Sequence, residues 1–148
     1  MKYKIKKISN LKIQSLKNLA DEAKNEGYNY VRKTMDEWLQ GINQFSKQSE
    51  VLWGVFDSEK CIAIGGLNID PFADEPAIGR VRRIYVSKKY RQKGIATYLL
   101  KKIIEQSKPF FSTLRLSTNN QNAAELYESM GFIKAEGVKQ THILSNPG

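Results

Sequence analysis

The stretch from Arg80 to Lys102 (RVRRIYVSKKYRQKGIATYLLKK) constrains the fold more than any other part of the chain. Residues 81–86 are rich in β-branched and aromatic side chains, which predicts a strand. After Gly94, apolar residues recur at helical spacing, which predicts an amphipathic helix. The chain must therefore turn sharply around Gly94, between the end of a strand and the start of a helix.

This turn predicts an anion-binding site. The first N–H groups of a helix have no partner within the helix, and the positive end of its dipole lies there. Gly94 and Ala96 carry little or no side chain, so a phosphate could approach the backbone closely. The stretch from Arg80 to Lys102 also contains no acidic residue. We interpret the corner as a cradle for a pyrophosphate.

The composition indicates a single globular domain over residues 1–148, because 41% of the residues are hydrophobic and 26% charged. Cys61 is the only cysteine, so the chain cannot form an internal disulfide or a cysteine-based metal cluster, and we expect no metal. We expect Cys61 to be a buried thiol. The N-terminus lacks the apolar core of a signal peptide, and no stretch reaches transmembrane length. We expect a cytoplasmic monomer or homodimer without a membrane partner.

A net charge of +9 favours an anionic partner, which could be nucleic acid, a phosphorylated cofactor or an acidic surface. The basic residues between Arg80 and Lys102 flank a glycine turn. A nucleic-acid-binding sheet would instead interleave basic residues with exposed aromatic ones. Nucleic acid is therefore the least favoured of these partners.

The whole chain predicts the order β-α-α-β-β-β-α-β-α-β-β, a mixed α/β (α+β) domain with one central sheet of about seven strands and helices on both faces. The double glycine at 65–66 indicates a bulge or a close approach by another backbone. The aromatic residues of the segment GYNY (27–30) could pack in the core or line a substrate pocket, and we favour the core. Strands are expected at 3–8, 50–57, 61–69, 81–86, 113–117, 132–136 and 140–144, and helices from Leu11 to Gly27, from Tyr30 to Ile42, after Gly94, and from the asparagines at 119–122 to Gly131.

Two segments resemble a known family. RQKGIA (residues 91–96) is similar to the Arg/Gln-x-x-Gly-x-Gly/Ala signature of the GNAT superfamily of N-acetyltransferases. The strand ending at Val86 is similar to the family's cofactor-binding strand. The stretch from Asn120 to Phe132 resembles a second characteristic segment. The resemblance covers the whole chain in length and element order, and residues 80–132 in detail.

The resemblance implies acetyl-CoA as the donor and a primary amine of a small molecule or peptide as the acceptor, joined by direct attack. It implies that the pantetheine arm of the cofactor pairs with β-strand backbone where the strands at 81–86 and 113–117 separate. Asn120 would hydrogen-bond this arm, and Tyr127 would protonate the departing thiolate. The implied cofactor-binding residues are Ile84, Tyr85 and Val86 for the pantetheine, and Arg91, Gln92, Lys93, Gly94, Ile95, Ala96 and Thr97 for the pyrophosphate.

The sequence departs from the family pattern at the general base. Many members of the family carry a glutamate on one of the two separating strands, where this chain has Arg80 and Arg115. An arginine cannot act as a base at neutral pH. The acceptor amine would then lose its proton through ordered water. The candidates for holding that water are Asp70, Glu26 and His142.

The arginines of the strand at 80–86 suggest a feature of the acceptor. Regular alternation places Arg80, Arg82 and Ile84 on one face and Val81, Arg83 and Tyr85 on the other. Burying an unpaired guanidinium is costly, so at least one of these should meet an anion. We predict that Arg83 or Arg80 binds an acidic group of the acceptor or pairs with a protein carboxylate such as Asp70.

Three alternatives to a small-molecule acetyltransferase remain open. The chain could acetylate a protein N-terminus or a lysine, because paired helices at 11–42 could cover either a closed pocket or an open peptide groove. It could be a catalytically silent acyl-CoA sensor, which keeps the cradle without a base. The third and weakest alternative is nucleic-acid binding.

Overall fold

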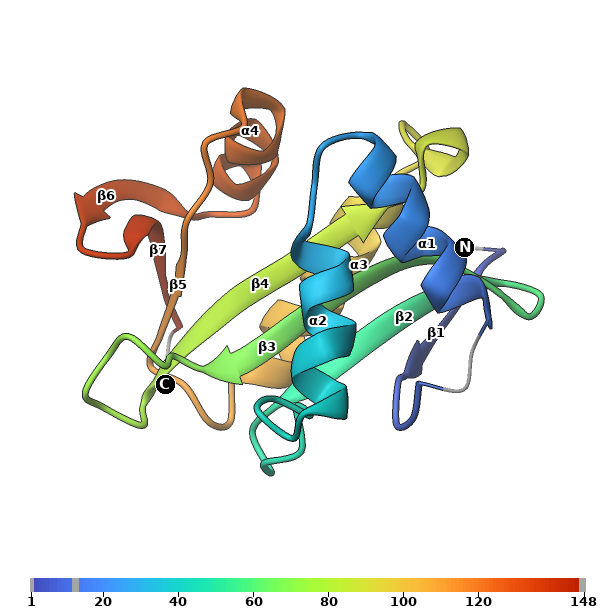
Figure 1. Ribbon diagram of the computed structural model, residues 1–148. Helices are drawn as coiled ribbons and strands as arrows, with labels where there is room; N and C mark the ends of the chain where they lie inside the picture. Colours follow the sequence, from blue (N-terminus) through green and yellow to red (C-terminus); the bar gives the residue numbers. More distant parts are fainter. Residues whose placement is uncertain (1, 12–13, 147–148) are drawn as a thin grey trace.

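One mixed sheet, in the order β1-β2-β3-β4-β5-β7-β6, runs through the computed structural model, which describes residues 2–11 and 14–146 (Figure 1). The predicted fold class and element order are confirmed. The strands are β1 (Lys4–Lys7), β2 (Val51–Asp57), β3 (Lys60–Ile69), β4 (Ile78–Val86), β5 (Thr113–Leu116), β6 (Ile133–Gly137) and β7 (Gln140–Ser145). The helices are α1 (Gln14–Asn25), α2 (Tyr30–Leu39), α3 (Ile95–Ser107) and α4 (Gln121–Ser129), with a short 3-10 turn η1 (Lys88–Tyr90).

Two predicted helix boundaries differ from the structure. Leu11 lies in a bend, so the expected helix start there is wrong, and residues 12–13 lie outside the described residues. Helix α2 ends at Leu39 instead of Ile42, because Gly41 adopts a left-handed conformation with φ of +73°. Its N–H donates to the carbonyl of Trp38 (3.1 Å), which closes the last turn of the helix.

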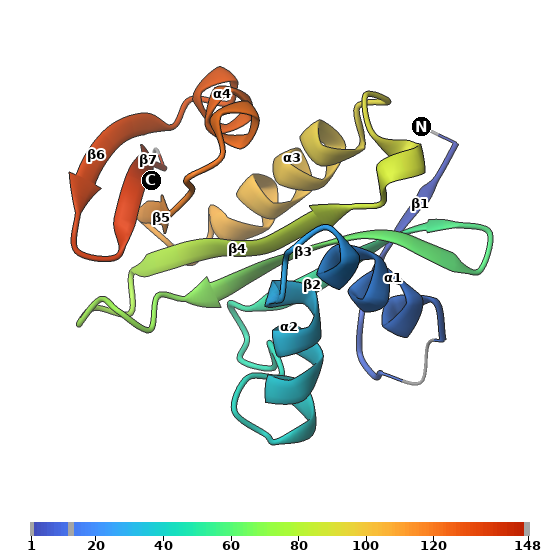
Figure 2. The same ribbon diagram turned by 45° about the horizontal axis from the view of Figure 1, so that its top comes forward.

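The helices cover the sheet on both sides. Figure 2 shows α1 and α2 beneath the sheet and α3 and α4 above it. The apolar stripe of α3, including Leu99 and Ile103, packs with Leu114 of β5 in one core cluster. On the other face, Leu16 and Leu19 of α1 pack in a second cluster. No helix in the described residues is long and apolar enough to cross a membrane.

Strands β4 and β5 are parallel, but they pair only near their beginnings. The register joins Ile78 with Thr113, Gly79 with Leu114 and Arg80 with Arg115. β4 continues to Val86 beside β3 alone, while β5 curves away from it (Figure 1). The residues of β4 after Arg80 therefore have one sheet edge without a strand partner.

A β-bulge shifts the register in the middle of β4. Ile64 pairs with Tyr85 and Gly66 pairs with Arg82, so two residues of β4 oppose the single residue Gly65. Arg83 within the bulge has φ of +64°. The irregularity expected at residues 65–66 is therefore present, but the extra residue belongs to the partner strand β4. A Cβ at Gly65 would lie 2.9 Å from a methyl carbon of Leu99, so α3 approaches the sheet closely there.

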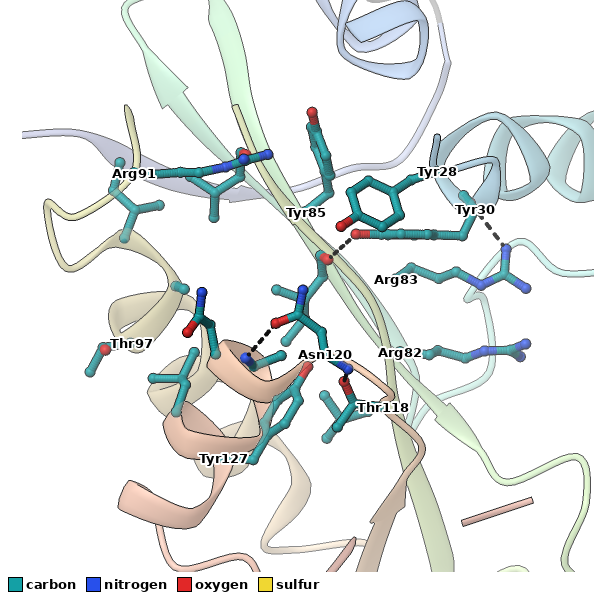
Figure 3. A pocket seen from close by; sticks show the side chains of 18 of the residues that line it. Tyr28, Tyr30, Arg82, Arg83, Tyr85, Arg91, Thr97, Thr118, Asn120 and Tyr127 are labelled. Carbon is teal, nitrogen blue, oxygen red and sulfur yellow. Dashed lines mark hydrogen bonds between the residues drawn. The ribbon is translucent and has the colours of Figure 1, made fainter. Parts of the chain in front are cut away.

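The bulge makes the predicted assignment of faces along β4 wrong. Val81 and Ile84 both contact the core cluster that includes α3, although strict alternation would place them on opposite faces. The side chains of Arg82 and Arg83 extend side by side in the same direction (Figure 3). One extra residue in a strand inverts the alternation beyond it.

Candidate active site

A cleft of about 960 Å³ opens where β4 and β5 separate. Its walls come from β4, the start of α3, the segment before α4, α4 itself and the connection between α1 and α2 (Figure 3). Of the residues predicted to bind the cofactor or act on it, Lys93 alone does not line the cleft. The lining residues among them are Ile84, Tyr85, Val86, Arg91, Gln92, Gly94, Ile95, Ala96, Thr97, Asn120 and Tyr127.

The start of α3 presents a row of free backbone donors. The first helical bond runs from the N–H of Tyr98 to the carbonyl of Gly94 (3.0 Å). None of the six N–H groups from Gln92 to Thr97 donates to any residue in the described part of the chain. Gln92 and Gly94 have φ of +60° and +78°, which bends the chain into a concave turn before the helix. This geometry suits a phosphate.

Arg91 lies beside this row but is already engaged. Its guanidinium forms two bonds to the carboxylate of Glu26, of 2.9 and 2.6 Å, and its Nε donates to the carbonyl of Val86 (3.0 Å). These bonds from Arg91 hold the pKa of Glu26 below its usual range, with the hydroxyl of Tyr85 as a second donor. Glu26 is thus the counterion of Arg91, and it does not line the cleft.

The open edge of β4 presents the main chain of Ile84 and Val86. Ser87 donates its N–H to Ile62 of β3 (2.8 Å), and Tyr85 pairs with Ile64 of the same strand. Because ladder bonds alternate, the residues between them point their N–H and carbonyl groups away from β3. The main chain of Tyr85 is bonded to β3. Of the three strand residues predicted to bind the pantetheine, only Ile84 and Val86 therefore present main-chain groups at the open edge.

The side chains of Asn120 and Tyr127 reach the cleft from α4 and its cap. The Oδ1 of Asn120 accepts from the N–H of Ala123 (3.0 Å) and caps the helix, while its Nδ2 donates to no described residue. The ring of Tyr127 packs edge-on against Phe132 (5.8 Å between centroids). Its hydroxyl bonds to no described residue, and burial raises the pKa of Tyr127 to about 12. The phenol therefore stays protonated at neutral pH.

The opposite wall is formed by Tyr28, in the connection between α1 and α2, and by Tyr30, the first residue of α2. The hydroxyl of Tyr30 donates to the carbonyl of Ile84 (2.8 Å), and the rings of Tyr28 and Tyr30 lie 5.8 Å apart (Figure 3). Burial raises the pKa of Tyr30, and the proximity of Tyr127 adds to the effect. The expectation that the GYNY aromatics pack in the core holds for Tyr30, which packs against the second core cluster and also lines the cleft. Tyr28 is exposed and lines the cleft.

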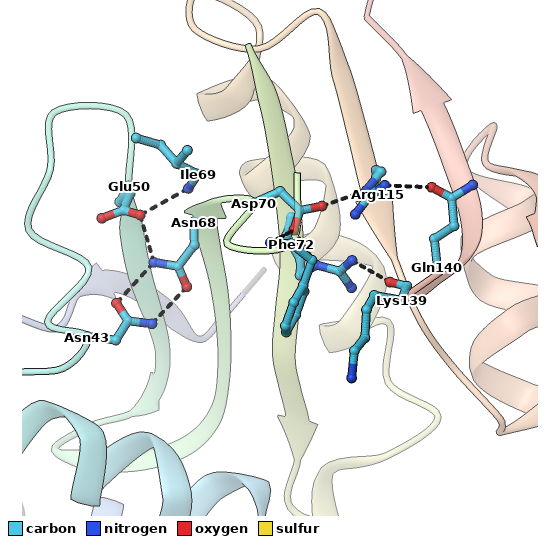
Figure 4. A network of polar contacts seen from close by, with 10 residues as sticks. Asn43, Glu50, Asn68, Ile69, Asp70, Phe72, Arg115, Lys139 and Gln140 are labelled. Carbon is cyan, nitrogen blue, oxygen red and sulfur yellow. Dashed lines mark hydrogen bonds and ion pairs between the residues drawn. The ribbon is translucent and has the colours of Figure 1, made fainter. Parts of the chain in front are cut away.

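Asp70 is the centre of a buried ionic network at the closed end of the cleft (Figure 4). Its carboxylate accepts from Arg80 (3.0 Å) on β4 and from Arg115 (2.6 Å) on β5, and also from the N–H of Phe72 (2.9 Å). Arg80 further donates to the carbonyl of Lys139 between β6 and β7. Burial alone would raise the pKa of Asp70, but these donors outweigh it and hold the pKa below its usual range.

The pairing of Arg80 with Asp70 confirms one of the two outcomes predicted for the strand arginines. Arg83 also pairs with a protein carboxylate. It donates to Glu37 (3.2 Å) and to the hydroxyl of Thr34 (3.0 Å) on α2. The charges of Arg80 and Arg83 are therefore compensated inside the protein. We do not retain Arg80, Arg83 and Asp70 as acceptor-binding residues.

None of the three candidates for holding a catalytic water lines the cleft. Glu26 and Asp70 are bound by arginines, as described above. His142 is buried on β7, where its Nε2 contacts Glu128 and its Nδ1 contacts Thr141, both at 2.8 Å. Among the described residues, no Asp, Glu or His side chain lines the cleft, and no group of three or more potential metal ligands occurs.

Little in the sequence indicates which residues line the closed end of the cleft. The alternation predicted along β4 fails from Arg83 onward, because the bulge could not be located to the residue. Phe72 belongs to a loop and carries no periodic signal, yet it lines the cleft beside Arg80. The GYNY tyrosines were the one usable signal, because aromatic residues between two helices can face a cavity.

The chain is similar to known proteins over most of its length. The family described as "Acetyltransferase (GNAT) family" matches residues 13–132. Among solved structures, a protein from Exiguobacterium sp. 255-15 superposes with a TM-score of 0.87 at 23% identity, over 98% of this chain and 94% of the other. No curated protein matches the chain.

Two further structures of similar fold are of named N-acetyltransferases. The ribosomal-protein-S18-alanine N-acetyltransferase from Escherichia coli has a TM-score of 0.72 at 16% identity, over 99% of this chain and 95% of its own. The PaiA N-acetyltransferase from Thermoplasma acidophilum, solved in complex with coenzyme A, has a TM-score of 0.70 at 19% identity, over 98% of this chain and 99% of its own. At these identities the likeness shows the fold.

Proposed function

The chain belongs to the GNAT family of acetyltransferases, and we propose that it transfers the acetyl group of acetyl-CoA to a primary amine by direct attack. The observation that carries the proposal is one continuous cleft. It leads from the free N–H groups of residues 92–97, along the open edge of β4, to the hydroxyl of Tyr127. Coenzyme A bound to the PaiA N-acetyltransferase, which has the same fold, supports this choice of donor.

Each part of the cleft has a proposed role toward the donor. The N–H groups of residues 92–97 hold the pyrophosphate, with added charge from Lys93 and from Arg91. The pantetheine arm lies along β4, where it accepts from the N–H groups of Ile84 and Val86 and from the free amide nitrogen of Asn120; the carbonyls of the two strand residues already accept from Tyr30 and Arg91. The proposed reaction uses no metal. The donor would thereby fill the gap between β4 and β5 as an added strand does.

The acetyl transfer forms a C–N bond and breaks the C–S bond of the thioester. The hydroxyl of Tyr127 donates a hydrogen bond to the sulfur as negative charge develops there. The amine loses one proton in the attack, and this proton reaches the thiolate through Tyr127 or water. An acceptor that arrives as an ammonium must first lose a further proton; since no described carboxylate lines the cleft, we propose that this proton passes to water and not to a side-chain base.

A protein N-terminus is the second candidate acceptor. Tyr28 and Phe72, which line the cleft, are 39% and 50% exposed, so this part of the wall is open to solvent and could admit a chain end. The fold is shared with an enzyme that acetylates the alanine of a ribosomal protein. Acceptors of both kinds belong in the same assay.

The test combines donor binding with turnover. Acetyl-CoA at about 100 times its Kd should stabilise the protein by roughly 2.7 kcal/mol, which a thermal shift would detect. A panel of small amines and short peptides is then assayed for release of the coenzyme A thiol. No thermal shift would refute the donor. Tight donor binding without turnover on any amine would favour the acyl-CoA sensor, and affinity for nucleic acid that falls steeply with salt would favour the weakest alternative.

A further inference from the structure

Four arginines line the cleft, and one of them has no hydrogen-bond or ion-pair partner in the part of the chain that the structure describes. Arg80 is bound by Asp70, Arg83 by Glu37 and Arg91 by Glu26. Arg82 forms no hydrogen bond or ion pair with any residue that the structure describes. It is also partly buried, so water does not fully solvate it.

The two carboxylates whose charges act favourably on Arg82, Glu37 and Asp70, are already bound by Arg83 and Arg80. No carboxylate of the described residues lines the cleft, and the guanidinium of Arg83 extends beside it (Figure 3). Burial and then the nearby charge of Arg83 lower the pKa of Arg82 to about 10. A guanidinium in such a place is destabilised unless an anion from outside the chain joins it.

Arg82 also lies away from the part of the cleft assigned to the donor. The cradle follows the C-terminal end of β4, whereas Arg82 stands before the bulge, near the closed end marked by Arg80 and Phe72. Figure 3 shows its side chain extending away from Asn120 and Tyr127. A phosphate of the donor in the cradle is therefore not the anion that Arg82 would meet.

We infer that the acceptor carries a carboxylate as well as its amine, and that Arg82 binds this carboxylate and so determines acceptor specificity. The inference rests on the proposed function, because it takes this end of the cleft as the acceptor site. A guanidinium suits the task, since its planar fork can donate two parallel bonds to one carboxylate. A free amino acid and an acidic residue near a peptide N-terminus share this chemistry.

The same charges bear on the missing base. A cation near an ammonium group disfavours the charged form and lowers its pKa. Arg82 and its neighbours would thus increase the neutral fraction of the bound amine, which is the form that attacks. The carboxylate would meanwhile offset the repulsion between the ammonium and these arginines. A purely cationic amine gains no such compensation and should bind weakly.

The test compares matched ligands on the protein saturated with coenzyme A. A series of ω-amino acids, with one to five methylene groups between amine and carboxylate, is titrated beside the corresponding amides. Calorimetry gives each Kd. A charge-assisted bond contributes about 1.5–3 kcal/mol, so the best amino acid should bind about 10- to 100-fold more tightly than its amide. The chain length at this optimum reports the separation between the amine and carboxylate sites.

Three variants identify the residue responsible. Arg82→Gln should abolish the preference for the carboxylate, and Arg82→Lys should keep part of it, because the charge remains without the fork. Lys33→Gln removes an exposed positive charge on α2 outside the cleft and should leave the preference unchanged. Circular dichroism and the coenzyme A affinity check that each variant is folded.

The outcomes separate the inference from the proposed function. Equal binding of acids and amides, or a preference that survives Arg82→Gln, would overturn the inference whatever the turnover. A preference lost in Arg82→Gln, without acetyl transfer to any ligand, would support the carboxylate site and refute the enzyme. Peptides beginning with an Ala-Glu or Ala-Gln pair form a second arm. If the acid is preferred over its amide only among the peptides, the carboxylate belongs to a peptide acceptor. If the acid is preferred only among the amino acids, it belongs to a small molecule.

Discussion

Tyr127 and Tyr30 face the same stretch of β4 from opposite walls, but their hydroxyls are in different states. Tyr30 donates to the carbonyl of Ile84, whereas Tyr127 bonds to no described residue. With a pKa of about 12, Tyr127 is a weaker acid than a thiol, whose pKa is about 8.5. Complete proton transfer from the phenol to the thiolate is therefore unfavourable. The main contribution of Tyr127 should be a hydrogen bond to the developing thiolate.

Tyr127→Phe should lower kcat by about 100-fold, the usual cost of removing one preorganised donor from a developing anion. The Kd for acetyl-CoA should stay within about twofold, because the ring and its packing on Phe132 remain. The loss should be constant from pH 6 to 9, since Tyr127 is protonated throughout that range. Steady-state kinetics and donor titration measure these quantities.

The control for Tyr127→Phe is Tyr98→Phe, which removes a phenol hydroxyl from α3 outside the cleft. It should leave kcat unchanged. A Tyr127→Phe enzyme with full kcat would show that the sulfur needs no hydrogen bond from this residue. A loss that grows with pH would instead indicate that another titrating group acts as the donor.

At this scale, the sequence could identify residues whose role depends on local spacing. Gly94, Asn120 and Tyr127 lie at fixed offsets within one turn or one helix, so a motif could place them. The pairing of Arg80 was predicted as one of two outcomes, because a buried cation requires an anion. The position of Arg83 beside Arg82 could not be predicted, since it depends on a single-residue bulge that the sequence does not locate.

Among the elements, the start of α3 is where backbone conformation matters most. Gly94 has φ of +78°, and a Cβ added there would meet nothing within 4 Å. The glycine is therefore needed for its dihedral angle and not for lack of space. An alanine could relieve the strain only by rotating the peptide, which would turn the N–H groups of the cradle away from the cleft.

Gly94→Ala should raise the Kd for acetyl-CoA by at least about tenfold, which corresponds to roughly 1.4 kcal/mol of lost binding. Gly41→Ala is its matched control, because Gly41 also has a positive φ of +73° with nothing within 4 Å, at the end of α2. Both variants should lose about 1 kcal/mol of unfolding free energy. An equal Kd for the two variants would show that the left-handed turn does not shape the donor site.

The order and type of the elements could be predicted because periodicity is a local property. The walls of the cleft could not, because they depend on which elements meet in space. The GYNY segment illustrates the difference. Its position between two helices was evident, but its place opposite α4 depends on how α1 and α2 pack on the sheet.

For the whole molecule, the decisive feature is that β4 and β5 join through only three residue pairs. Asp70 reinforces this junction, since it binds an arginine from each strand and its side chain is fully buried. Through Arg80 the network also reaches the turn at Lys139. The ionic network thus holds the closed end of the cleft while the other end stays open.

Asp70→Asn should lower the unfolding free energy at pH 7 by about 3 kcal/mol, because it leaves two arginines without their counterion. The folded-state pKa of Asp70 lies below its usual value, so its contribution is complete above about pH 4 and declines as the pH falls further. The difference between wild type and variant should narrow over that acidic range. Urea unfolding at pH 7, 5, 4 and 3 measures it.

Asp74→Asn, in the same loop but exposed, is the control for Asp70→Asn and should cost less than about 0.5 kcal/mol. If the difference in unfolding free energy between wild type and Asp70→Asn were as large at pH 3 as at pH 7, the destabilisation would come from altered packing or hydrogen bonding and not from the lost charge.

Binding of acetyl-CoA should protect the backbone N–H groups of every second residue along the open edge of β4. The N–H groups of Ile84 and Val86 point away from β3, whereas Tyr85 is paired with Ile64. In amide hydrogen exchange followed by NMR, acetyl-CoA should slow Ile84, Val86 and the cradle residues 92–97. Tyr85 should be protected already and change little. Equal slowing of all three strand residues would indicate general stabilisation, and a change confined to the cradle would mean that the pantetheine arm does not run along β4.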